Sequence, residues 1–130
     1  MNEPLFYRVS VKALIRDDEN RILISRELDD RWDLLGGGLE HGEDPIMGLR
    51  RELQEEAGLE AAEIAEHPCY FLTIHNSEKN MHIANVFYEV KLRSFDFVPS
   101  EECQELRFVS ADDIVDLNVQ PNIQKLFNLL

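Results

Sequence analysis

Residues 37–59 constrain the fold more than any other part of the sequence, because a glycine-rich turn leads directly into an amphipathic helix. Asp44 can cap the free N–H groups of the first helical turn, and Pro45 suits the first helical position. Gly58 is the residue type expected just past a helix end. The segment therefore predicts a glycine turn followed by a helix from Pro45 to the residue before Gly58.

The predicted helix carries an apolar stripe and an acidic face side by side. The stripe recurs at spacings of three and four residues and consists of Ile46, Leu49, Leu53 and Ala57. The acidic face consists of Glu52, Glu55 and Glu56. At about 100° per residue the two faces adjoin, which predicts carboxylates at the edge of the core, in a cleft.

Like charges at this spacing repel each other, and a hard divalent cation with oxygen ligands would compensate them. A solvated acidic helix face is the alternative interpretation.

The segment also follows a longer pattern, G-x5-E-x7-R-E-U-x-E-E-x-G-U, where U is aliphatic. The matching residues are Gly37, Glu43, Arg51, Glu52, Leu53, Glu55, Glu56, Gly58 and Leu59. This pattern is a complete Nudix box, so the chain resembles the Nudix hydrolase family. The resemblance implies an α/β fold, the Nudix α/β/α sandwich with a mixed curved sheet between helices. It also implies a single Nudix hydrolase domain over residues 1–130.

The resemblance implies a metal-dependent hydrolase that cleaves the pyrophosphate linkage of a nucleoside diphosphate derivative by water attack at phosphorus. Nucleoside triphosphates, including oxidised ones, are the first substrate class, and ADP-ribose or sugar nucleotides come next. Mg²⁺ is the expected cofactor, and Mn²⁺ can substitute. One alternative is a non-catalytic nucleotide-sensing module on the same fold. Another is an acidic interaction domain with no ligand.

By resemblance, the metal ligands are the Gly37 carbonyl and the carboxylates of Glu52, Glu55 and Glu56. Arg51 precedes Glu55 by four residues, so it can pair with it and orient the cluster; an ordinary surface arginine is the alternative. Glu43 is expected to brace the loop against the helix, and Gly58 to end the helix.

The catalytic base is either a box glutamate or an acid on a later loop, where Glu101, Glu102 and Glu105 are candidates. Glu105, just before a short predicted strand, is the first choice, and solvated loop acids are the alternative. For substrate binding, Arg26 is a candidate phosphate contact. Trp32 can stack on a base, although core packing explains it equally well.

Composition limits the partners. A chain of 130 residues suits one domain, and 44% hydrophobic residues argue against disorder. The net charge of −13 argues against nucleic acid polymers and anionic membranes, but not against a small nucleotide that brings its own cations.

No signal peptide and no apolar run of about 20 residues is visible, so a cytoplasmic location is expected. Free thiols at Cys69 and Cys103 are favoured over a disulfide. The sequence is compatible with either a monomer or a homodimer.

Hydrophobic periodicity predicts the remaining elements. Residues 5–15 and 21–25 are expected to form a hairpin, and residues 69–75 and 81–92 a second one. Residues 61–67 are expected to be irregular or a short strand. A short strand is predicted at 106–109, a helix from Ser110 to about Leu117, and a last helix from Pro121.

Overall fold

The computed structural model describes residues 5–130, so residues 1–4 of the predicted domain lie outside it. The larger sheet contains β1 (Arg8–Leu14), β4 (Gly36–Gly38), β5 (Ala61–Ile64), β6 (Tyr70–Asn76) and β7 (Met81–Leu92). The smaller sheet contains β2 (Ile22–Arg26), β3 (Trp32–Asp33) and β8 (Glu105–Val109). The helices are α1 (Pro45–Ala57), the 3₁₀ helix η1 (Asp113–Asp116) and α2 (Pro121–Leu129).

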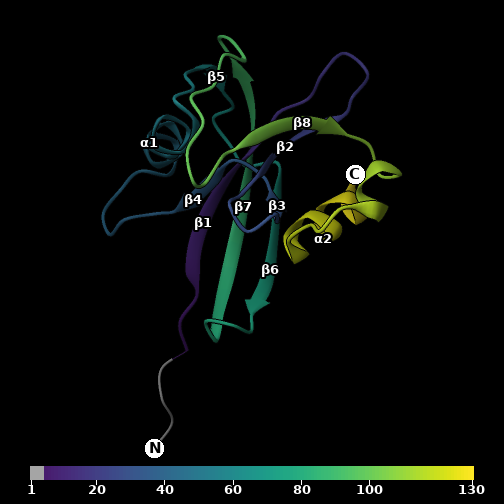
Figure 1. The fold of residues 1–130 in the computed structure, drawn as a ribbon. Coiled ribbons are helices and arrows are strands. Elements are labelled where there is room, and N and C mark those ends of the chain that lie inside the picture. Colours follow the sequence, from purple (N-terminus) through teal and green to yellow (C-terminus); the bar gives the residue numbers. More distant parts are fainter. Residues whose placement is uncertain (1–4) are drawn as a thin grey trace, which may run out of the picture.

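The larger sheet is mixed. Strands β1 and β7 pair in parallel, whereas β4, β5 and β6 are antiparallel to the strands they join. Figure 1 shows α1 and α2 on opposite sides of these strands. The predicted α/β/α sandwich with a mixed sheet is confirmed.

Helix α1 begins and ends where local signals predict. The Asp44 carboxylate accepts hydrogen bonds from the N–H groups of Ile46 (3.1 Å) and Met47 (3.2 Å). Gly58 adopts the left-handed conformation with φ 62°, which a residue with a side chain rarely adopts. Both ends of the helix are therefore set by residues next to it in the sequence.

The core has two parts, one on each side of the larger sheet. Leu49, Leu53 and Ala57 of α1 are fully buried in the first part. Ile123 and Leu126 of α2 are fully buried in the second. Burying a leucine or isoleucine side chain stabilises the fold by about 1.5–3 kcal/mol, so the apolar stripe of α1 holds its acidic face against the sheet edge.

The predicted hairpin over residues 5–25 forms only at its turn, where Leu23 N–H donates to the Ile15 carbonyl (2.9 Å), and the predicted pairing of the two full strands is wrong. Strand β1 begins at Arg8 and belongs to the larger sheet, whereas β2 belongs to the smaller one. A single bridge between Arg16 and Ile22 connects the two segments. The alternation of residue types predicted the strands correctly, but it carries no information on their partners, and β1 instead pairs with β7.

The hairpin of β6 and β7 is confirmed, with Asn76 opposite Met81 at the turn. Residues 61–64 form the short strand β5. The helix predicted from Ser110 is instead the 3₁₀ turn η1, in which only Ile114 is buried. With one buried side chain, no apolar stripe supports a longer helix.

Cys69 and Cys103 are free thiols, as predicted. Across residues 5–130, no helix combines the length and the apolar character needed to cross a membrane.

Candidate active site

Two glutamates of α1 lie against the glycine turn that forms β4. The N–H group of Gly36 donates a hydrogen bond to Glu56 Oε1 (3.3 Å). A Cβ placed on Gly37 would lie 2.6 Å from Glu52 Oε2, so the turn has room for this carboxylate only because residue 37 is glycine. The Glu52 side chain is 13% exposed, and Glu56 is 6% exposed. The glycine turn and the helix thus form a shared, largely buried acidic site.

A third carboxylate reaches this site from the loop between β7 and β8. Oxygen atoms of Glu52, Glu56 and Glu102 lie within 4.8 Å of one another. The Ser100 hydroxyl donates to the backbone carbonyl of Glu56 (2.6 Å) and accepts from the N–H group of Glu102 (3.2 Å). Ser100 therefore fastens the loop to the end of α1, where Glu102 meets the two helix glutamates.

Burial controls the protonation of Glu56. Removal from water and the nearby Glu52 together raise the pKa of its carboxyl to about 9, although Lys12 opposes this shift. A divalent cation at this position would favour the ionised form. Because the three donors are carboxylate oxygens at close range, the group fits a hard cation such as Mg²⁺.

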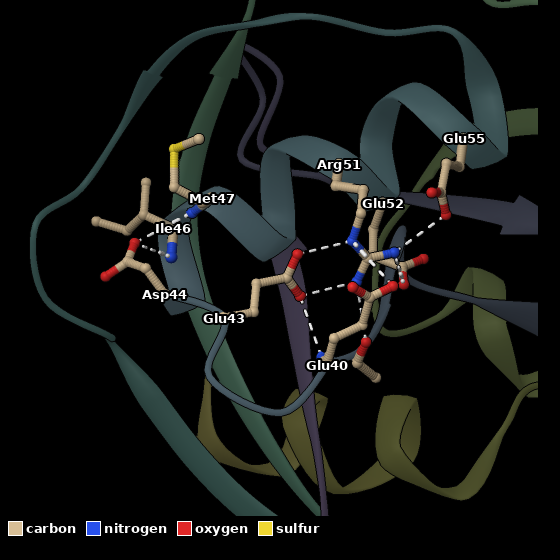
Figure 2. A network of polar contacts seen from close by, with 9 residues as sticks. Glu40, Glu43, Asp44, Ile46, Met47, Arg51, Glu52 and Glu55 are labelled. Carbon is tan, nitrogen blue, oxygen red and sulfur yellow. Dashed lines mark hydrogen bonds and ion pairs between the residues drawn. The ribbon is translucent and has the colours of Figure 1, made fainter.

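Arg51 connects the acids around the site, as Figure 2 shows. Its guanidinium contacts the carboxylates of Glu43 (2.8 Å), Glu52 (3.0 Å) and Glu55 (3.0 Å), and donates to the Gly38 carbonyl (3.2 Å). Hydrogen bonds from Arg51 and from the N–H group of Glu40 lower the pKa of Glu43 to about 2. Arg51 and Glu43 together join the glycine turn to α1.

The model of the NUDIX domain matches residues 6–130 of this chain. The chain belongs to the NUDIX domain family. Nudix hydrolase 25 of Arabidopsis thaliana is 36% identical over 74 residues, which cover 55% of this chain and 42% of that protein. An RNA pyrophosphohydrolase of Saccharophagus degradans is 38% identical over 60 residues, or 45% of this chain and 35% of that protein. The matched segments thus span less than half of these curated relatives.

A solved structure supports the Nudix fold. The MutT protein from Methanosarcina mazei Go1 superposes with a TM-score of 0.79 at 22% identity, and the alignment covers 95% of this chain and 91% of that one.

Within the Nudix box, Glu55 occupies a different position from the other two glutamates. Its side chain is 58% exposed and pairs with Arg51 at the rim. It is not part of the group formed by Glu52, Glu56 and Glu102. The predicted ligand set therefore divides into two largely buried carboxylates and one at the rim.

The later-loop acids also separate. Glu105 lies in β8, opposite Arg26 of β2, and its carboxylate accepts from Arg26 Nε (3.3 Å). Arg26 was predicted to contact phosphate and Glu105 to act as the base. Instead, the two side chains form an ion pair between neighbouring strands. Glu102, named among the candidates but not as the first choice, is the loop acid that joins the box glutamates.

Trp32 packs in the core. It is 4% exposed and lies among the buried residues on the α2 side of the sheet. The Arg107 guanidinium lies 5.1 Å from the centre of its ring. This burial supports the core-packing alternative over stacking on a substrate base.

Lys12 is a residue whose importance the sequence did not reveal. It is 7% exposed, and its ammonium group contacts the Asp33 carboxylate (3.1 Å) and the carbonyls of Leu34 and Gly36 (both 3.4 Å). Burial lowers its pKa, but Asp33 and Glu56 outweigh this, and the net pKa is raised. In the sequence Lys12 is one of four basic residues, with Arg8, Arg26 and Arg31, that are possible phosphate contacts, and no local pattern distinguishes it from the others.

Proposed function

We propose that this protein is a metal-dependent hydrolase that cleaves the pyrophosphate linkage of a nucleoside diphosphate derivative by water attack at phosphorus. The observation that carries the proposal is the group formed by Glu52, Glu56 and Glu102 above the glycine turn. Membership of the NUDIX domain family supports the same conclusion.

In this proposal Glu52 and Glu56 hold the divalent cation, and the Gly37 carbonyl is a further ligand. Mg²⁺ or Mn²⁺, when bound, screens the phosphate charge and acidifies water. Arg51 positions Glu52 and keeps Glu55 at the rim.

The Glu102 carboxylate accepts a proton from the attacking water, whose oxygen bonds to phosphorus as the bond to the bridging oxygen breaks. Glu102 replaces Glu105 as the first choice for this role, because Glu105 is already paired with Arg26.

For the substrate we propose a nucleoside triphosphate, including oxidised forms, with ADP-ribose or a sugar nucleotide as the next class. The small-molecule site suits a chain with a net charge of −13, which disfavours nucleic acid polymers. A cytoplasmic location, a single domain and a monomeric or homodimeric state are further predictions.

A hydrolysis assay on a panel of nucleotides with Mg²⁺ tests the proposal. We expect turnover of one substrate class by the wild type and a loss of at least about 100-fold in Glu56→Gln, which keeps the shape and removes the charge. Glu66→Gln, an exposed residue outside the site, is the matched control and should be unchanged. Turnover that survives in Glu56→Gln would refute the ligand assignment. Tight nucleotide binding without turnover would instead indicate a nucleotide-sensing module.

A further inference from the structure

Arg8 lies against β4 on the face opposite Glu52. A Cβ placed on Gly38 would lie 2.6 Å from Arg8 Cζ, so the guanidinium lies directly against the α-carbon of this glycine. Gly37, one residue earlier, leaves room for the Glu52 carboxylate in the same way. Because successive residues of a strand point to opposite faces, β4 has a carboxylate on one face and a guanidinium on the other.

The charge of Arg8 is not neutralised by a neighbouring side chain of residues 5–130. Arg16 pairs with Glu89 (3.2 Å) and Arg93 pairs with Glu60 (3.1 Å), but no carboxylate in this part of the chain forms an ion pair with Arg8. The residue is also exposed to solvent. The chain has 26 acidic and 13 basic residues, so a basic side chain without an acidic partner is unusual here and is available to an anion from solution.

Arg8 lines a pocket of about 720 Å³ at the end of the larger sheet, where Figure 1 shows the start of β1 near the turn between β6 and β7. Its other polar side chains are Tyr7, His41, Asn80 and His82, and none of the described residues that line it is acidic. The volume is within the roughly 300–1,000 Å³ that is typical of small-molecule sites. The pocket therefore combines a suitable size with an excess of hydrogen-bond donors and positive charge.

A row of rings across three strands holds His82 in place. The His82 ring lies 5.5 Å from the Tyr7 ring and stacks on the His75 ring at 4.5 Å, centre to centre. His75 Nε2 lies 3.2 Å from Asn80 Oδ1, which fixes the end of the row at the turn. A side chain that is already held by its neighbours loses little conformational entropy when it binds a ligand, so His82 is a preorganised donor.

We propose that this pocket binds a phosphate group, with the Arg8 guanidinium as the main contact and His41 and His82 as further donors. A guanidinium and imidazole N–H groups, with no carboxylate among the described lining residues, are the chemistry that recognises a phosphate. The site lies across β4 from the acidic group, and β4 is the edge strand of its sheet. The phosphate is either the terminal one of a substrate that extends around this edge or part of a separate molecule.

Binding is measured on metal-free protein in EDTA, with the ring C–H resonances of the histidines followed by NMR. Inorganic phosphate is the probe, and sodium chloride at the same ionic strength is the control. We expect phosphate to shift the resonances of His41 and His82 and to leave those of the exposed His67 unchanged. Arg8→Gln should weaken the affinity for phosphate at least about tenfold, whereas Arg93→Gln, the matched control, should not. Equal shifts with chloride, or an affinity that Arg8→Gln does not change, would overturn the proposal.

Gly38→Ala tests the geometry without removing the charge. The added methyl group meets the end of the flexible Arg8 side chain, so the protein should fold while the guanidinium is displaced and the affinity for phosphate falls. In the Arg8→Gln background the same change should cause no further loss, because the displaced group is already absent. An equal loss in both backgrounds would show that residue 38 acts independently of Arg8, and the assigned contact would be wrong.

Hydrolysis assays distinguish the two sources of the phosphate. If the substrate supplies it, Arg8→Gln should lower kcat/KM for a nucleoside triphosphate at least about tenfold and leave that for the corresponding diphosphate unchanged. If a separate molecule supplies it, both values should stay the same while the histidine shifts persist. Phosphate binding at Arg8 in a protein that hydrolyses nothing would keep this site and refute the proposed function. Hydrolysis without the histidine shifts would refute this site alone.

Discussion

The Glu52 carboxylate lies against the α-carbon of Gly37, where a Cβ would come within 2.6 Å of Oε2. The glycine therefore does more than shape a turn, because it leaves the space that a carboxylate of the site occupies. The atom in the way is the end of a flexible side chain, so a methyl group at this position would displace the carboxylate rather than the backbone.

Gly37→Ala is accordingly expected to fold, with a change in the free energy of unfolding below about 1 kcal/mol. Its affinity for Mn²⁺ and its rate of substrate turnover should each fall about 10–100-fold. Titration calorimetry and the hydrolysis assay measure both effects. The loss should not add to that of Glu52→Gln in the double variant, because both changes remove the same ligand. Additive losses would mean that the two residues act independently.

The two loop acids give a second prediction. Glu102→Gln should lower kcat by about 100-fold, because it removes the carboxylate nearest the box glutamates. Glu105→Gln should change kcat by less than about threefold, because it alters only the ion pairs with Arg26 and Arg107, away from the acidic group. Steady-state kinetics of the two variants decide between them, and the reverse order of effects would restore Glu105 as the base.

The pairing of Glu43 with Arg51 predicts acid sensitivity. The folded protein holds the pKa of Glu43 at about 2, below its ordinary value of 4.5, so the pair stabilises the fold fully above pH 4.5. This contribution declines as the pH falls from 4.5 to about 2. Thermal melts should therefore show Glu43→Gln below the wild type at pH 7, with the difference shrinking across that acidic range. A difference that does not depend on pH would show that hydrogen bonding, rather than charge, holds the pair.

Glu56 predicts the opposite behaviour in metal-free protein. Burial raises the pKa of this carboxyl from 4.5 to about 9, so the unfolded chain loses its proton first and the folded state is destabilised as the pH rises between these values. In EDTA, Glu56→Gln should be more stable than the wild type by on the order of 1 to 3 kcal/mol at pH 8 and equal to it near pH 4.

Melting curves at both pH values, repeated with Mg²⁺, check the Glu56 prediction. Added Mg²⁺ should raise the melting temperature of the wild type but not that of Glu56→Gln. A variant less stable than the wild type at pH 8 in EDTA would contradict the buried, protonated carboxyl.

What the sequence could predict follows from how local each signal is. The bounds of α1 depend on Asp44, Pro45 and Gly58, which are part of the helix ends themselves, so they could be predicted. The β6–β7 hairpin could be predicted because a short polar turn joins its strands. Strand β1 has its main partner, β7, far along the chain, and its own residues do not identify that partner.

The site divides in the same way. Glu52 and Glu56 could be predicted because helical spacing puts them on one face. Choosing between Glu102 and Glu105 required the Ser100 contact with the carbonyl of Glu56, which depends on how a loop meets a helix 44 positions away. The burial of Lys12 depends on Asp33 and the glycine turn, and no local pattern encodes that.

The parallel pairing that puts Arg8 beside Ile83 has a consequence for the newly made protein. During synthesis the first strand has no main partner until β7 has left the ribosome, and the acidic group is incomplete until Glu102 follows. Such long-range pairing forms late and slowly compared with a local hairpin. A chain released before residue 102 would therefore carry the entire box sequence and still lack the carboxylate that completes the acidic group of Glu52, Glu56 and Glu102.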